Sequence, residues 1–384
     1  MDNFWNKIKR RLSESHGIAT IGVADIGGNG IAAIFWFYIA SLVGEGHYGE
    51  ISYFLATAGI VSSLSLVGAS NTLYVYTSKN VKIHSPIYFI SLVAGTFSSI
   101  VLFVIFHNVS ISIVTMGYIV YNLSISTLLG EKSYKEYSKY VITQKILMIV
   151  LAIGLYYIIG INGIVLGIGL SLLPYFVRLY KGFKEQKIDF SIIKERYAFV
   201  INSYFLDISN SFISSVDKII IAPLLGFIIL GNYQLAIQFL TVMYIIPNIF
   251  YKYFLPQEAS GASTNNLKKW SIVASVFLAI VGITLSPIVL PLLFPKFSHV
   301  VIILQIVSVA VIPNTINLTI ISKILSLEKS KIVLIGSILY IVIQIITIII
   351  LGNLYGIIGV SIALVLAESI QTVYFVSIKQ LRKI

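Results

Sequence analysis

The chain has 384 residues, of which 57% are hydrophobic and 11% are charged, and its mean hydropathy is +0.93. This composition excludes a soluble globular protein, because a soluble chain needs far more polar surface to cover its core. The net charge of +12 is explained by basic loops that lie beside anionic lipid, so no nucleic-acid partner is expected. The absence of cysteine excludes disulfides and thiolate chemistry.

Apolar stretches of the length needed to cross about 30 Å of hydrocarbon recur along the chain. Twelve are predicted, at residues 17–43, 50–73, 85–106, 111–130, 140–159, 162–180, 197–222, 232–254, 270–294, 299–322, 332–351 and 356–377. The first stretch lacks a small-residue cleavage pattern, so we expect a retained helix rather than a signal peptide. The fold class is therefore predicted to be an all-α polytopic membrane protein.

Positive charge is confined to alternate junctions between these stretches. Of the 27 Lys and Arg residues, 25 lie in the two tails or in and beside the even-numbered junctions, with Lys145, Arg178 and Lys252 near the adjoining span ends. The odd-numbered junctions contain only Lys296, and the remaining basic residue, Lys218, lies inside a span. By the positive-inside rule, the basic junctions and both termini are predicted to be cytoplasmic. Membrane lipids are thus the first expected partner.

The twelve predicted helices divide into two groups of six around the longest hydrophilic stretch. Residues 1–182 are predicted to form an N-terminal lobe, residues 183–196 a cytoplasmic linker and residues 197–384 a C-terminal lobe. Two sequence matches suggest a duplication: Leu42-Val43-Gly44 with Leu224-Leu225-Gly226, and Gly160-Ile161-Asn162-Gly163 with Gly356-Ile357-Ile358-Gly359. Lobes with six helices each would share one orientation and place a transport site at their interface.

Ionisable side chains within the spans are costly, about 2.5 to 3.5 kcal/mol each on insertion scales, so each is a candidate functional residue. The predicted spans contain Asp25, Asp207, Asp217, Lys218 and Glu368. Asp25 and Asp207 each lie 19 residues before the first glycine of a matched pair, Gly44 and Gly226. This equivalence supports the repeat.

Polar residues also recur at helical spacing on one face of the seventh span, namely Ser203, Asp207, Asn210, Ser211, Ser214 and Lys218. In the first span Asp25 and Asn29 share a face. Asp25 is expected to be either a cation or proton site or an acceptor for neighbouring helices. Lys218 is expected either to contact a phosphate or sugar group or to extend its side chain outward to the membrane surface. It need not pair with Asp217, because successive helical residues point about 100° apart. Glu368, near the middle of the last span, suits a proton-carrying group.

Several functions are excluded by what the loops lack. There is no phosphate-binding glycine-rich loop, and no predicted cytoplasmic segment is long enough for an ATPase domain. A membrane glycosyltransferase would need a sizeable outer loop with carboxylates, whereas the outer loops are short and contain only Glu45 and, at a span end, Glu50. The chain is not expected to be an enzyme, and no metal or cofactor is expected other than a coupling ion.

The stretch Ser41 to Tyr53, the segment Ser215-Val216-Asp217-Lys218-Ile219-Ile220-Ile221 and the turn Gly231-Asn232-Tyr233 resemble the Wzx-type polysaccharide flippases. These belong to the multidrug/oligosaccharidyl-lipid/polysaccharide (MOP) exporter superfamily, and the resemblance covers essentially the whole chain. It implies a MATE-like fold with two pseudo-symmetric six-helix lobes around a cavity. The implied function is translocation of a polyprenyl-linked glycan across the cytoplasmic membrane by alternating access, for cell-surface polysaccharide synthesis.

The resemblance also implies roles for particular residues. An acidic residue on the first helix of the drug-exporting branch makes Asp25 a candidate site for a coupling ion, H⁺ or Na⁺, and leaves a cation-coupled drug or metabolite exporter as the alternative function. Flippases for diphosphate-linked sugars are expected to line their cavity with basic residues, and here only Lys218 lies within a span. Lys145, Arg178, Lys252 and Lys323 are candidates to attract the diphosphate at the cytoplasmic mouth, or are positive-inside anchors only.

Overall fold

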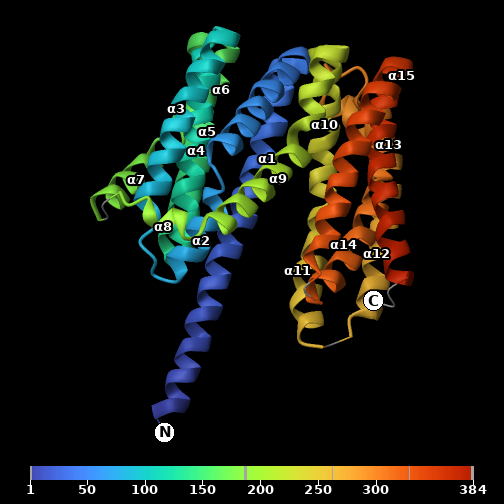
Figure 1. The fold of residues 1–384 in the computed structure, drawn as a ribbon. Coiled ribbons are helices and arrows are strands. Elements are labelled where there is room, and N and C mark those ends of the chain that lie inside the picture. Colours follow the sequence, from blue (N-terminus) through green and yellow to red (C-terminus); the bar gives the residue numbers. More distant parts are fainter. Residues whose placement is uncertain (1, 186–187, 262, 328, 382–384) are drawn as a thin grey trace. The chain divides into compact units, whose positions relative to one another are not determined.

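The computed structural model describes the backbone of residues 2–185, 188–261, 263–327 and 329–381, and side chains from Gly27 onward except at positions 185, 256, 259, 379 and 381 within those ranges. This part of the chain contains helices and connecting turns but no strand (Figure 1). The helices are α1 (Asp2–Ser65), α2 (Ala69–Ser78), α3 (His84–Phe106), α4 (Val109–Gly130), α5 (Tyr134–Ile159), α6 (Ile161–Leu170), α7 (Pro174–Glu185), α8 (Ser191–Lys194), α9 (Tyr197–Leu225), α10 (Phe227–Met243), α11 (Ile245–Ala259), α12 (Asn265–Leu293), α13 (Val300–Ser308), α14 (Val311–Ser326) and α15 (Ser330–Leu381).

Membrane-spanning segments account for most of these helices. Within the described residues, nine helices are long and apolar enough to cross a membrane, or ten if α10 and the bent α11 count as one span. Two of the nine, α1 and α15, contain a residue with non-helical dihedral angles, at Gly44 and at Gly356. Each therefore consists of two helical segments. Counting these segments separately, and α10 with α11 as one span, gives the twelve spans that the hydropathy pattern predicts.

Glycines with positive φ mark four of the reversals between spans. Gly44 (φ 77°, ψ 177°) and Gly226 (φ 88°, ψ 168°) have nearly the same conformation, as do Gly160 (φ 70°, ψ −146°) and Gly356 (φ 57°, ψ −132°). Residues with a Cβ rarely adopt these angles, so glycine is needed at each turn. These are the same two pairs that the sequence matches, so the local backbone geometry supports an internal repeat.

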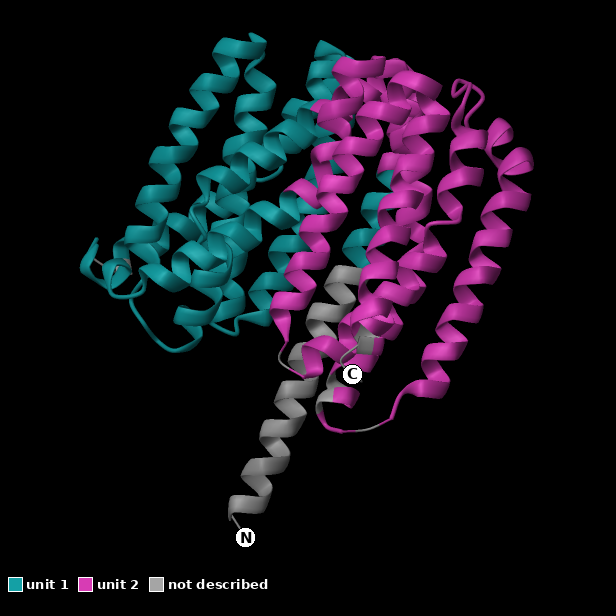
Figure 2. Cartoon of the chain, turned by 45° about the vertical axis from the view of Figure 1, so that its right-hand side comes forward, with its two compact units in different colours: residues 1–35, 54–211 teal, residues 36–53, 212–384 magenta. Residues whose placement is uncertain are grey.

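The chain forms two compact units (Figure 2). Unit 1 comprises residues 1–35 and 54–211, and unit 2 comprises residues 36–53 and 212–384. The end of the first α1 segment and the start of the second thus belong to unit 2, whereas the first half of α9 belongs to unit 1. The predicted lobe boundaries at residues 182 and 197 concern the helix repeat rather than these units, and they stay a prediction.

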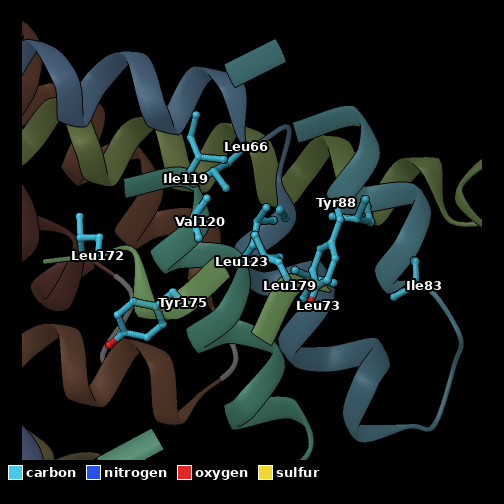
Figure 3. Close-up of a cluster of buried hydrophobic side chains, with 12 residues drawn as sticks. Leu66, Leu73, Ile83, Tyr88, Ile119, Val120, Leu123, Leu172, Tyr175 and Leu179 are labelled. Atoms are coloured by element: carbon cyan, nitrogen blue, oxygen red, sulfur yellow. The ribbon is translucent and has the colours of Figure 1, made fainter. Parts of the chain in front are cut away.

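The packing of both units is that of a protein solvated by lipid. Large apolar side chains such as Phe97, Ile158 and Leu292 are 70% to 80% exposed, whereas many Ser and Thr residues are buried and donate to a carbonyl one turn earlier, as Thr115 does to Ile111 O (2.8 Å). Exposed apolar surface on this scale is stable only against hydrocarbon. The core of unit 1 gathers Leu73, Tyr88 and other buried apolar residues of α2, α3, α4 and α7 (Figure 3).

Candidate functional site

The polar face of α9 is divided between the two units. In unit 1, Asp207 Oδ1 accepts a hydrogen bond from Asn71 Nδ2 of α2 (3.2 Å), and Ser211 Oγ donates to Gly59 O of α1 (3.2 Å). Ser203 is buried one turn earlier, whereas Asn210 is exposed. This part of the face therefore packs α9 against its neighbours, and Asp207 acts there as an interhelical hydrogen-bond acceptor.

Asp217 and Lys218 form an ion pair in unit 2, with 3.1 Å between Lys218 Nζ and Asp217 Oδ1. The helical geometry of adjacent residues does not require this pairing. It arises because the long lysine chain folds back over its own helix, where Nζ also donates to Ser214 O (2.7 Å). Tyr233 of α10 donates to Asp217 Oδ2 (3.1 Å), and the Asp217 side chain is almost completely buried. The charge of Lys218 is thus compensated locally in this structure, while its contact with a phosphate or sugar and its outward snorkelling stay predictions.

Glu368, on the second segment of α15, is buried without a cationic partner among the described residues. Its Oε1 accepts from Asn314 Nδ2 (3.2 Å) and its Oε2 from Asn317 Nδ2 (3.1 Å), both on α14. Gln371 joins the same cluster by accepting from Asn317 (3.0 Å) and donating to Gly336 O (3.0 Å). Among the described residues, the Glu368 carboxyl group accepts hydrogen bonds from neutral amide groups only, so its negative charge could be neutralised by either a proton or a small cation.

A cavity of about 370 Å³ in unit 2 joins these two carboxyl groups. Asp217 and Lys218 of α9 line one side, and Asn314 of α14 with Glu368 of α15 lines another. Tyr340 lies within electrostatic range of both carboxylates. Gln344, also lining the cavity, has a buried Oε1 with no hydrogen-bond partner. Carboxylate, amide and phenol oxygens are ligands that suit a hard cation or a proton. No group of three or more His, Cys, Asp or Glu that could hold a metal ion occurs among the described residues.

The remaining predicted residues are not among the described residues that line this cavity. The side chain of Asp25 lies outside the described residues, and Asn29 is exposed. Lys145 is the twelfth residue of α5, roughly 16 Å along the helix, and its Cγ lies 3.8 Å from the position that a Cβ on Gly28 would occupy. Its role at the cytoplasmic mouth stays a prediction.

The other three predicted mouth residues have different surroundings. Arg178 of α7 is buried and forms an ion pair with Glu131 at the end of α4. Lys252 of α11 is exposed, and Lys323 lies half-buried in the last turn of α14. Arg178 belongs to unit 1 and the two lysines to unit 2, and their joint role at the cytoplasmic mouth stays a prediction.

Two polar networks in unit 2 were not predicted. In one, Glu45 Oε2 accepts from Asn232 Nδ2 (2.7 Å) and from Ser298 N and Oγ (both 3.0 Å), and Lys296 Nζ donates to Leu42 O (3.2 Å). Lys296, the basic residue of the predicted outer junctions, is thus held against the end of the first α1 segment. The one sequence signal near this network was Gly44, the residue before Glu45, which belongs to a matched glycine pair.

The second network ties the ends of three helices together. Glu258 of α11 pairs with Lys268 of α12 (2.5 Å) and accepts from Thr264 (2.7 Å) and from Ser322 of α14 (2.8 Å). Burial raises the pKa of the Glu258 carboxyl, but the hydrogen bonds from Lys268, Thr264 and Ser322 together hold this pKa below its ordinary value.

Comparisons with known proteins identify the fold. No protein-family model and no curated protein matches the chain. Among solved structures, the lipid II flippase MurJ in an inward closed conformation is 15% identical, with a TM-score of 0.78 over 94% of this chain and 87% of that one. An inward-facing multidrug resistance MATE family transporter of the MOP superfamily is 13% identical, with a TM-score of 0.64 over 95% and 98%. A mutant of the Vibrio cholerae MATE transporter VcmN is 12% identical, with a TM-score of 0.60 over 96% and 98%. The chain is therefore an all-α multi-pass membrane protein with the MATE-like fold of these MOP-superfamily transporters.

Proposed function

We propose that this protein is a flippase that moves a lipid-linked oligosaccharide across the cytoplasmic membrane by alternating access, with both termini cytoplasmic. The observation that carries the proposal is the likeness to a lipid II flippase over 94% of the chain, with a TM-score of 0.78. The motifs Ser41 to Tyr53 and Ser215 to Ile221, which resemble Wzx-type flippases, support it independently. The partner is a polyprenyl-linked glycan for cell-surface polysaccharide synthesis, and the protein is a transporter rather than an enzyme.

The Glu45 network suits a gate at the predicted outer face. It joins the turn after the first α1 segment to α10 and to the turn before α13 through hydrogen bonds that the half-buried Glu45 accepts from the buried Asn232 and from the exposed Ser298. Such bonds can be exchanged for bonds to water at about 0.5 to 1.5 kcal/mol each, so they can open and close during transport. The gate would have to open when the head group is released on the outer side.

The charges within the spans limit how the head group is bound. Lys218 is compensated by Asp217, whereas Lys145 has no anionic partner among the described residues. Lys145 is thus the intramembrane cation that we expect to contact an anionic head group. Because a single lysine is a weak diphosphate site compared with a cluster of arginines, we expect modest affinity for the substrate.

The test is a reconstituted translocation assay. Proteoliposomes that contain the protein and a labelled polyprenyl-diphosphate glycan should transfer label to the far leaflet at least ten times faster than protein-free liposomes. Lys145→Gln should slow this transfer, and Lys269→Gln, which removes an exposed lysine of α12 that is not a candidate phosphate-attracting residue, should not. No acceleration by the unaltered protein would overturn the proposal.

A second candidate function, export of drugs or metabolites coupled to H⁺ or Na⁺, is favoured by the cavity between Asp217 and Glu368. The uncompensated carboxyl group of Glu368 and the unpartnered Oε1 of Gln344 provide oxygen ligands for a coupling ion. In liposomes with an imposed ion gradient, amphiphilic cations should then be pumped, and Glu368→Gln should abolish the pumping. The exposed Glu195→Gln is the control. Gradient-dependent pumping without glycan transfer would favour this function over the first.

A further inference from the structure

A polar cavity of about 490 Å³ lies in unit 1, and none of its lining residues has been assigned to transport above. It is formed where α2 ends at Ser78, α3 begins at His84 and α4 ends at Gly130. Its lining includes Thr77, Asn80, Lys82, His84, Glu131 and Lys132. The end of α4 packs so closely on α2 that a Cβ added to Gly130 would lie 2.7 Å from Thr77 Cβ. The side of the cavity formed by these two helices is therefore tightly packed.

Basic groups outnumber acidic ones around this cavity. Lys82 and Lys132 line it and take part in no ion pair among the described residues. Its acidic lining residue, Glu131, is already paired with Arg178, whose side chain is about nine-tenths buried. The Nε of Arg178 is buried without a hydrogen-bond partner. A cavity lined by two lysines that take part in no ion pair among the described residues is suited to an anion.

The two lysines are carried on tight turns rather than on flexible loops. Asn80, two residues before Lys82, and Lys132 itself both have φ of 58°, in the left-handed region that residues other than glycine rarely occupy. Backbone hydrogen bonds close both turns, from Val81 N to Tyr76 O and from Ser133 N to Leu128 O (both 2.9 Å). The bonds fix these unusual conformations, so the cavity is preorganised.

The depth of the cavity indicates which anion it meets. Two candidate membrane-spanning helices end at its rim, α3 at His84 and α4 at Gly130, so we expect the rim to lie at the level of the lipid phosphates of that leaflet. Arg178 lies on the buried side of α7, while Phe176, Val177 and Tyr180 on the same helix are 40% to 61% exposed and face lipid. The α3 helix, 23 residues long, also begins here without a side-chain cap, so its positive end adds to the attraction.

We propose that this cavity binds the phosphate group of a membrane lipid at the predicted cytoplasmic face, with Lys82 and Lys132 as the contacting residues. Basic pockets between spans on this side of a membrane commonly hold phosphate-bearing head groups. Two sources share this chemistry, namely the bulk anionic phospholipid of the leaflet and the polyprenyl diphosphate of the proposed substrate. The site does not depend on transport, and it can exist whether or not the protein is a flippase.

The experiment compares two variants that remove the same charge from the same loops. Lys82→Gln/Lys132→Gln removes the two lining lysines, whereas Lys79→Gln/Lys135→Gln removes two nearby lysines that do not line the cavity. The intact protein in neutral detergent is titrated with phosphatidylglycerol, polyprenyl diphosphate, phosphatidylcholine and inorganic pyrophosphate, and bound ligand is counted by native mass spectrometry. The first double variant should bind the anionic lipids at least ten times more weakly, and the control should bind as the unaltered protein does.

The outcomes separate the sources and the proposals. Loss of phosphatidylglycerol binding alone supports a site for bulk lipid, and loss of polyprenyl diphosphate binding alone supports a site for the substrate. Equal weakening in both variants would overturn the proposal, because the effect would then be one of surface charge. Binding of inorganic pyrophosphate without either lipid would also overturn it. Since binding is counted without transport, a negative translocation assay leaves this result unaffected.

Discussion

At the level of single residues, charge compensation distinguishes the two buried acids of unit 2. Asp217 has a lysine beside it in the sequence and pairs with it in space (3.1 Å), whereas Glu368 is surrounded by amide groups. In a buried ion pair each charge compensates the other, whereas either charge alone in a low-dielectric site strongly destabilises the folded state. The two acids are therefore expected to respond differently to substitution.

Lys218→Gln should destabilise the protein by on the order of 3 kcal/mol, because it leaves the buried Asp217 carboxylate with hydrogen bonds but no cation. Thermal unfolding in detergent measures the loss. The double variant Asp217→Asn/Lys218→Gln keeps the shapes and removes both charges, so it should recover most of the stability. If the double variant were as unstable as the sum of both single variants, the pair would not be coupled.

At the level of helices, a close crossing in unit 2 depends on two glycines. Gly49, on the α1 segment that follows Gly44, lies against Phe227 O of α10, and Gly231 of α10 lies against Glu45 O. Each glycine stands four residues after the residue that its counterpart contacts, so the two helices cross in a symmetric manner. The close approach of backbones is the packing that small residues allow between helices in a membrane.

Gly49→Ala and Gly231→Ala should each destabilise unit 2 by about 3 kcal/mol, the upper end of the usual cost of overpacking. The added methyl group would collide with a backbone carbonyl, which cannot rotate away as a side chain can. Gly46→Ala is the matched control on the same helix, because a Cβ there would meet only Ile228 Cγ1 at 3.7 Å, an ordinary contact. Equal unfolding temperatures for Gly46→Ala and Gly49→Ala would contradict this account.

The sequence predicted the helical segments well and the helix-to-helix contacts poorly. Hydropathy alone locates the twelve spans, and the matched glycines mark turns that only glycine adopts easily, because both signals are local. The partner of Asp207, Asn71, lies 136 residues away, and no local pattern reveals it. Helical geometry also fails for Lys218, because it places the Cβ atom but not the end of a flexible side chain.

The Glu258 network should make the stability of unit 2 depend on pH. Glu258 lies beyond the apolar segment that ends at Leu255, and its pKa in the folded state is below the ordinary value of 4.5. The carboxylate therefore stabilises the folded state above pH 4.5, and this contribution is lost as the pH falls through the lower, folded-state pKa. The unfolding temperature of Glu258→Gln should be lower than that of the unaltered protein at pH 7, and the difference should shrink toward pH 3. A difference independent of pH would contradict the assignment.

At the level of the whole molecule, the exposed apolar surface indicates a membrane environment and the charge pattern predicts a single orientation in it. Exposed side chains such as Phe97 and Leu292 require hydrocarbon around the helices. Lys and Arg are almost absent from alternate junctions, which sets the direction of each span. Since the sidedness follows from the basic junctions, it can be tested independently of any substrate.

The first segment of α15, Ser330 to Tyr355, offers a direct test, because the chain contains no cysteine and single cysteines can be introduced at either end. This segment has 26 residues before the break at Gly356, roughly 38 Å of helix, which is enough to cross the bilayer. Tyr355→Cys should react with a membrane-impermeant maleimide in intact cells, whereas Lys329→Cys should react only after permeabilisation. Both positions are exposed, so a difference in labelling reports the side of the membrane rather than burial. The reverse pattern would place the basic junctions outside, and with them the cavity of Lys82 and Lys132.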